Sequence, residues 1–184
     1  WLLEYVDAWR QRTLENNGII PTKIGLDGRI GGPQGKWYEG VYGWGFTVVV
    51  PQNGQLANRN THYMGLTGFS NALLVTGDLS YTHIWSSMID TINAQARESD
   101  GQTLYPRMYG DEGWYDYQKN PYAYGALELY YWSMEEKDRQ RLGAGGWFGY
   151  LEGRNPTYPE SVLRGDLNRV ARQVEAMRRD PTTP

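Results

Sequence analysis

The 184-residue sequence contains no cysteine, only two histidines and little net charge. The lack of cysteine excludes disulfides, thiolate zinc sites, iron–sulfur clusters and cysteine nucleophiles. Two histidines are too few for a multi-histidine metal centre. Lys and Arg number 18 against 21 Asp and Glu, a net charge of -3, so we expect no nucleic-acid partner and no anionic membrane surface. No apolar run approaches about 18 residues, so we expect no membrane-spanning helix.

Phenylalanine is also scarce, whereas tryptophan, tyrosine and glycine are abundant. The chain has 3 Phe against 8 Trp and 15 Tyr, so most of its aromatic rings carry a polar group. Such rings suit half-exposed grooves, where one edge is buried and the other bonds water or ligand. The 23 glycines cluster with them. Two interpretations follow: rings that anchor glycine-rich loops, or a groove in which flat rings stack on sugars.

Apolar spacing predicts helices separated by long glycine-rich and aromatic loops. Asp78 follows Gly77 as a candidate N-cap, which implies a helical hairpin around this break. The run 46–50 is β-branched and is at most a short strand. The expected helices are 2–15, 61–76, 79–97, about 120–138 and 159–179.

An internal repeat follows the first and third expected helices. Both copies begin with Asn-Gly or Asp-Gly, continue through an apolar stretch, and end in Pro-x3-Gly-x-[Asp/Glu]-Gly. Alignment on the proline matches Asp27 with Glu112, and each copy is followed by Trp-Tyr, at Trp37 and at Trp114. Helical units of this kind stack because one hairpin cannot bury its apolar stripe alone. We expect the loop tips, with their acids and rings, to gather on one surface.

The repeat resembles the (α/α) toroid, six-hairpin glycosidase-like proteins, which include glycoside hydrolases and polysaccharide lyases. The resemblance implies an all-α fold: stacked antiparallel helical hairpins of an incomplete (α/α) toroid, with long Gly/aromatic loops and at most a short hairpin. Residues 1–184 would form a single domain and a fragment of a larger toroid, with repeat units at about 1–77 and 79–138 and a third begun at 159–179. The class favours a periplasmic or extracellular location, and the uncovered helix faces would make the chain a homo-oligomer.

The sequence therefore predicts a carbohydrate-directed protein that cleaves a polysaccharide, with glycoside hydrolysis ahead of lyase chemistry. Asp27 and Glu112 are the candidate catalytic pair, because glycan hydrolysis commonly uses two carboxylates. Both acids also fit a purely structural role, since carboxylates beside glycine accept backbone N–H bonds in turns. The candidate substrate-binding residues are Arg29, Trp37, Tyr38, Tyr42, Trp44, Arg107, Trp114 and Tyr115.

Other chemistries stay open at this point. In a lyase, Arg29, Arg107 and Lys36 would pair with acidic sugars. The base would then be a tyrosine or histidine, with Tyr109, Tyr115, Tyr117 and His62 as candidates. Asp111, Glu112 and Asp116 are a weak calcium candidate without EF-hand spacing, and no other cofactor or metal is expected. The alternatives to catalysis are a non-catalytic glycan-binding domain and a helical scaffold that meets protein.

Overall fold

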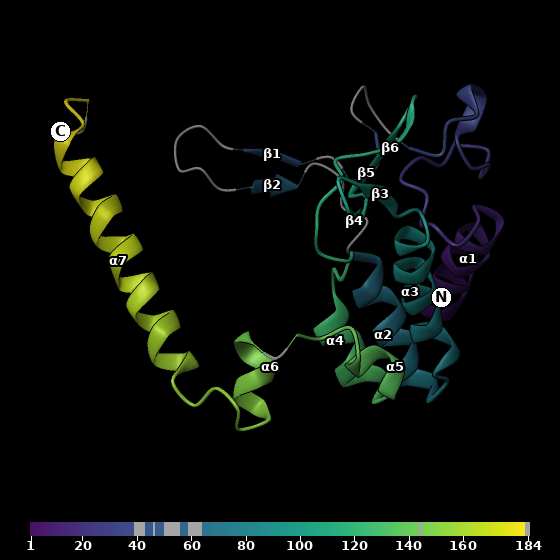
Figure 1. Cartoon of the computed structure of the whole chain (residues 1–184). Coiled ribbons are helices and arrows are strands. Elements are labelled where there is room, and N and C mark those ends of the chain that lie inside the picture. Colours follow the sequence, from purple (N-terminus) through teal and green to yellow (C-terminus); the bar gives the residue numbers. More distant parts are fainter. Residues whose placement is uncertain (39–42, 46, 50–55, 59–63, 144, 183–184) are drawn as a thin grey trace. The chain divides into compact units, whose positions relative to one another are not determined.

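The computed structural model describes residues 1–38, 43–45, 47–49, 56–58, 64–143 and 145–182 (Figure 1). The chain divides into two compact units, residues 1–139 and residues 140–184. Helices of the first unit are α1 (Leu2–Glu15), α2 (Met64–Thr76), α3 (Ser80–Asn93), α4 (Ala126–Ser133) and α5 (Glu136–Arg139), with a short 3-10 helix at Gly32–Gln34. The second unit contains α6 (Gly146–Leu151) and α7 (Tyr158–Arg179). No described helix is long and apolar enough to cross a membrane.

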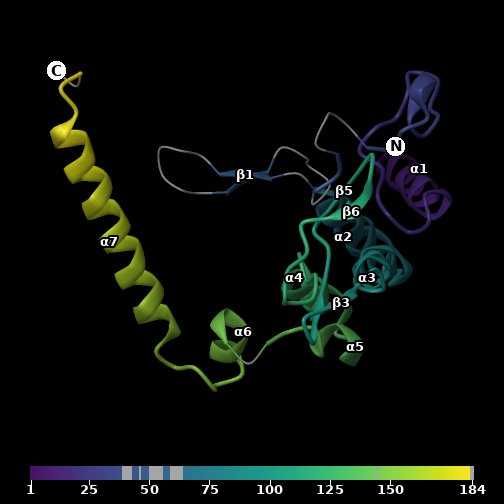
Figure 2. The ribbon, with the colours of Figure 1, turned by 45° about the horizontal axis from the view of Figure 1, so that its top comes forward.

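The helices α2 and α3 form the predicted hairpin and lie side by side (Figure 2). Gly77 ends α2 in a left-handed conformation, with φ of +73°, and its N–H donates to the Leu73 carbonyl at 2.7 Å. The Asp78 carboxylate then accepts the Ser80 N–H at 2.9 Å, although the N-cap of α3 is Leu79 and not the predicted Asp78. Local sequence signals therefore place this break correctly, although α3 ends at Asn93 rather than at 97.

The core of the first unit is built around α3. Its inner face contributes Trp85, Met88, Ile89 and Ile92, all with no exposed surface. The Trp85 ring lies close to two glycines, Gly65 of α2 and Gly125 before α4, where an added Cβ would meet ring atoms within about 3.4 Å. Small residues at these positions let three helical segments approach one large ring.

The expected single helix over 120–138 is wrong, because the chain there forms two short helices. Residues 121–125 are not helical, and Gly125 enters α4 in a left-handed conformation, with φ of +70°. Met134 ends α4 with φ of +52°, before α5 begins at Glu136. Two left-handed residues interrupt the α-helical hydrogen-bond ladder, and apolar periodicity alone does not report them.

The all-α prediction is also wrong: the fold is mixed α/β. In the described ranges, three separate antiparallel two-stranded sheets accompany the helices. They pair β1 (Thr47–Val49) with β2 (Leu56–Asn58), β3 (Arg97–Ser99) with β4 (Gln102–Leu104), and β5 (Met108–Gly110) with β6 (Gly113–Tyr115). Two of these hairpins, β3–β4 and β5–β6, lie between α3 and α4, in the stretch expected to be a long glycine-rich and aromatic loop. Three-residue strands carry too few residues for alternation to be recognised in the sequence.

The internal repeat corresponds to recurring backbone turns. Asn17 and Gly18 have φ of 56° and 81°, and the matching Asp100 and Gly101 have φ of 51° and 71°. The aligned prolines, Pro21 and Pro106, are both fully buried. Asn-Gly and Asp-Gly pairs favour this conformation because both residues tolerate positive φ. The repeat therefore encodes a turn followed by a buried proline, and in the second copy the turn joins β3 to β4.

Candidate functional site

The site begins where the segment around Trp44 lies against β5. Trp44 and Tyr109 exchange both backbone hydrogen bonds, with N–O distances of 2.8 and 3.0 Å. Gly43 and Gly45 flank this bridge with φ of +79° and +75°. A Cβ at Gly43 would overlap the Tyr109 carbonyl oxygen, and one at Gly45 would overlap the Arg107 carbonyl oxygen. Glycine is thus required on both sides of Trp44 by conformation and by space.

Aromatic side chains gather around this bridge from segments far apart in the sequence. Trp37 lies 4.9 Å from Tyr109, centroid to centroid, and Tyr109 lies 5.1 Å from Trp114. Fully buried Trp44 is within 6.3 Å of both Trp37 and Tyr122. We call this group the aromatic cluster; its members are Trp37, Tyr38, Trp44, Tyr109, Trp114 and Tyr122. Trp37, Tyr38, Tyr109 and Trp114 are half-buried and so keep part of their surface in solvent.

A polar group borders the aromatic cluster. Lys36 Nζ contacts both carboxylate oxygens of Asp111 at 2.6 and 2.8 Å, and the Tyr38 hydroxyl donates to the same carboxylate. These bonds from Lys36 and Tyr38 lower the pKa of Asp111. The bond to Asp111 raises the pKa of Tyr38 to about 12, so its phenol stays protonated at neutral pH. Lys36 and Asp111 keep 51% and 63% of their side-chain surface exposed, which leaves both open to a ligand.

The two predicted catalytic acids lie in turns. The Asp27 carboxylate accepts the Arg29 N–H at 3.1 Å and lies 3.6 Å from the Arg29 guanidinium, which is the local capping arrangement that the sequence also allowed. Glu112 is exposed in the turn between β5 and β6. Its neighbour Asp111 makes the contacts with Lys36 and Tyr38, so Asp111 joins the two repeat-derived loops. The catalytic assignment of Asp27 and Glu112 stays a prediction.

The remaining predicted binding residues occupy different environments. Arg107 donates to the carbonyls of Pro106, Asn120 and Pro121, so its guanidinium holds backbone in place. Tyr115 is 37% exposed. Tyr42 lies outside the described residues.

The sequence predicts Lys36 and Tyr109 as site residues only in the lyase alternative, and Asp111 only in the calcium candidate. One signal in the sequence indicates that these three residues lie near one another. It is the recurrence of a Trp-Tyr pair after each copy of the repeat, at Trp37 and at Trp114.

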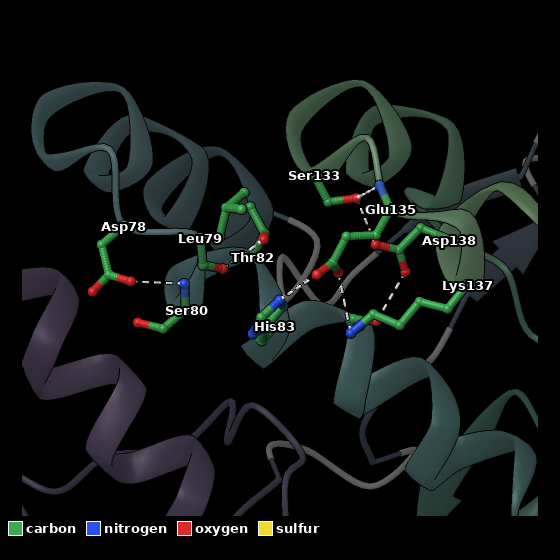
Figure 3. A network of polar contacts seen from close by, with 10 residues as sticks. Asp78, Leu79, Ser80, Thr82, His83, Ser133, Glu135, Lys137 and Asp138 are labelled. Atoms are coloured by element: carbon green, nitrogen blue, oxygen red, sulfur yellow. Dashed lines mark hydrogen bonds and ion pairs between the residues drawn. The ribbon is translucent and has the colours of Figure 1, made fainter.

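A second polar group, shown in Figure 3, ties α3 to α5. Fully buried Asp138 accepts hydrogen bonds from Ser86 at 2.9 Å and Ser133 at 2.7 Å. Beside it, His83 Nε2 lies 2.9 Å from Glu135, which also pairs with Lys137 at 3.2 Å. These bonds either connect two helices or stabilise the end of a helix, so we assign this group a structural role.

This network gives a pH-dependent stability. The contact with His83, and then the one with Lys137, lower the pKa of Glu135 below its ordinary 4.5. A lowered carboxyl pKa contributes stability above the unfolded-state pKa and loses it as the pH falls through the folded-state pKa. We therefore expect Glu135→Gln to reduce the free energy of unfolding near neutral pH by about 1 kcal/mol. The reduction should become smaller as the pH falls below the ordinary pKa of a glutamate carboxyl group.

Urea titrations of the wild type and Glu135→Gln at several pH values measure this difference. Glu136→Gln is the matched control, because the Glu136 side chain is 63% exposed and pairs with Arg139 only at 3.4 Å. A difference between wild type and Glu135→Gln that stays constant from neutral to acidic pH would contradict the assignment.

Within the part of the chain that the structure describes, no three or more His, Asp or Glu side chains group as metal ligands would. The calcium candidate at Asp111, Glu112 and Asp116 therefore gains no support from their arrangement. Gln118 contacts Asp116 at 3.3 Å, whereas Asp111 is bonded by Lys36 and Tyr38.

The chain is thus a small mixed α/β protein in which loop segments and the β5–β6 hairpin carry the aromatic cluster. Residues 1–108 and 143–184 match the family described as Domain of unknown function (DUF8034), and because this is more than half of the chain, the chain belongs to that family. The match includes Lys36, Trp37 and Tyr38 but not Asp111 and Trp114. No curated protein and no solved structure gives a significant match to the chain.

Proposed function

We propose that the first unit binds a glycan across the aromatic cluster and the adjoining Lys36–Asp111 pair. The observation that carries the proposal is the meeting of half-buried Trp37, Tyr38 and Trp114 rings beside an exposed charged pair. Aromatic faces stack against the apolar faces of sugar rings, while charged and hydroxyl groups bond the sugar hydroxyls around the edge. The surface thus combines both kinds of contact at one place.

The charges favour a neutral sugar over an acidic one. Lys36 and Asp111 neutralise each other at contact distance. Arg107 is engaged by backbone carbonyls, and Arg29 pairs with Asp27. Recognition of uronate or sulfate calls for cations that are available to the ligand. A neutral glycan therefore suits this surface better, which favours the binding and hydrolase alternatives over the lyase.

Cleavage is a separate part of the proposal. The proposed reaction is glycoside hydrolysis, with Asp27 and Glu112 as the carboxylates near the bound chain. Reducing-end release from neutral oligosaccharides measures this activity, and the expected result is a loss of turnover in Asp27→Asn and in Glu112→Gln. Retained turnover in both variants would remove these residues from the reaction while leaving the binding surface in place.

Titration of the whole chain with neutral and acidic oligosaccharides by isothermal calorimetry tests the binding. We expect a neutral oligosaccharide to bind and Trp37→Ala to weaken its binding by about tenfold, which is the loss of about 1.4 kcal/mol. Trp147→Ala is the matched control, because Trp147 is a 44% exposed tryptophan of the second unit. Tyr38→Phe keeps the aromatic ring and removes only its hydrogen bond to Asp111. Comparison with Trp37→Ala therefore distinguishes the loss of a ring that contacts the sugar from local unfolding around that ring. Absence of heat across the panel, or equal losses in Trp37→Ala and Trp147→Ala, would overturn the proposal.

A further inference from the structure

The longest helix of the chain has an apolar stripe that is exposed along its whole length. Every residue of α7 after Tyr158 is exposed, and the helix is continuous over its 22 residues (Figure 1). The stripe keeps 40–61% of each side chain in solvent; its members are Leu163, Leu167, Val170, Val174 and Met177. Such a length of apolar surface marks an interaction site.

The spacing of this stripe specifies the kind of partner. From Leu163 to Met177 the apolar residues recur at intervals of four, three, four and three. This is the 3.5-residue period of a coiled-coil seam, narrower than the stripe of a helix that packs on a globular core. Leu167 and Val174 take the a positions of the heptad, and Leu163, Val170 and Met177 take the d positions.

The polar face of α7 is largely neutralised within the helix. Arg164 pairs with Glu160, Arg169 with Asp166, and Arg179 with Glu175, each at 2.8 or 2.9 Å. A basic face that attracts anionic lipid would leave its arginines without nearby acids. The charge pattern therefore favours a protein partner over a membrane surface.

The residues beside the seam fit a second copy of the same helix in parallel orientation. In a parallel in-register pair, Asp166 lies opposite Ala171 of the other copy, and Gln173 lies opposite Arg178, so no like charges meet. In the antiparallel register that pairs Leu167 with Met177, Arg164 lies opposite Arg178 of the other copy, a pair of like charges. Like charges at this position are destabilising, so that antiparallel register is disfavoured.

We propose that α7 mediates self-association of the chain through a parallel, two-stranded coiled coil with Val170 at the centre of its seam. The inference is independent of the glycan-binding surface, which lies in the first unit. A seam of little more than two heptads is short, so the dimer would dissociate at low protein concentration.

Sedimentation of the whole chain over a concentration series tests the association. We expect a monomer–dimer equilibrium, and we expect Val170→Asp to weaken it at least about tenfold because it buries a charge in the seam. Arg172→Asp is the matched control, since position 172 lies on the face opposite the seam. A monomer over the whole range, or equal loss in both variants, would overturn the proposal; a monomer that binds anionic vesicles would replace it with a membrane surface.

The absence of cysteine makes the orientation testable. Met177→Cys places one thiol at a d position near the end of the helix. In the parallel pair two such thiols face each other, so oxidised glutathione should link two chains by a disulfide, whereas antiparallel pairing separates them. Ser161→Cys, on the outer face, is the control and should cross-link much less. Equal cross-linking of the two variants would overturn the parallel seam.

Discussion

Replacement of Trp85 by alanine is expected to destabilise the first unit by about 3–5 kcal/mol. Trp85 has no exposed surface and donates its indole N–H to the Tyr124 carbonyl at 3.0 Å. Its ring also lies against Gly65 and Gly125. Removal of the ring therefore leaves a cavity between α2, α3 and the start of α4, and removes the hydrogen bond to the Tyr124 carbonyl.

Urea unfolding followed by circular dichroism measures the effect of Trp85→Ala. Trp85→Phe keeps most of the volume and removes the N–H, so it should cost less than the alanine variant. Trp147→Ala removes a 44% exposed ring and should leave the stability of the first unit unchanged. Equal stabilities of Trp85→Ala and Trp147→Ala would mean that the core is not organised around α3.

Replacement of Gly43 by alanine is expected to separate the Trp44 segment from β5. Alanine at φ of +79° is strained by about 1–3 kcal/mol, and its methyl group would overlap the Tyr109 carbonyl oxygen. Relief of that overlap breaks the two backbone bonds between Trp44 and Tyr109. Because both residues belong to the aromatic cluster, Gly43→Ala should lower stability by about 3 kcal/mol and also abolish the proposed glycan binding.

Gly68→Ala is the matched control for this substitution. Gly68 lies inside α2, and an added Cβ there meets nothing within 4 Å. Alanine is the better helix former by about 0.5–1 kcal/mol, so Gly68→Ala should stabilise the chain. The two variants should thus shift the urea midpoint in opposite directions. A Gly43→Ala protein with native stability and native near-ultraviolet circular dichroism would contradict the close approach at Trp44.

Helices with strong local signals were predictable from the sequence. α1 occupies Leu2–Glu15 as expected, α7 begins and ends within one residue of its expected position, and the break at Gly77 and Asp78 is confirmed. In each case the apolar period and the capping residues lie within a few positions of one another. The elements missed are short: the hairpins β3–β4 and β5–β6 with three-residue strands, the six-residue helix α6, and the division between α4 and α5.

The candidate site was predictable only in part, because its contacts join segments far apart in the sequence. Trp37, Tyr38 and Trp114 were selected from their recurrence after the repeat, and the structure places all three in the aromatic cluster. Trp44 was selected as a binding residue but is fully buried beneath the others. Asp111, which bonds Lys36 and Tyr38, is separated from Lys36 by 75 positions. No spacing rule within the sequence connects them.

The sequence by itself determined the absence of thiol chemistry, the abundance of polar-edged rings, the turns of the repeat and the apolar stripe of α7, because each depends on composition or on neighbours a few residues apart. Only the tertiary structure decided that the fold is mixed α/β, which rings are buried and which half-exposed, and that Asp111 rather than Glu112 bonds Lys36. The strands are too short to be recognised in the sequence, and the ring burial and the Asp111 contacts depend on distant segments, whose contact free energy arises only when the chain has folded.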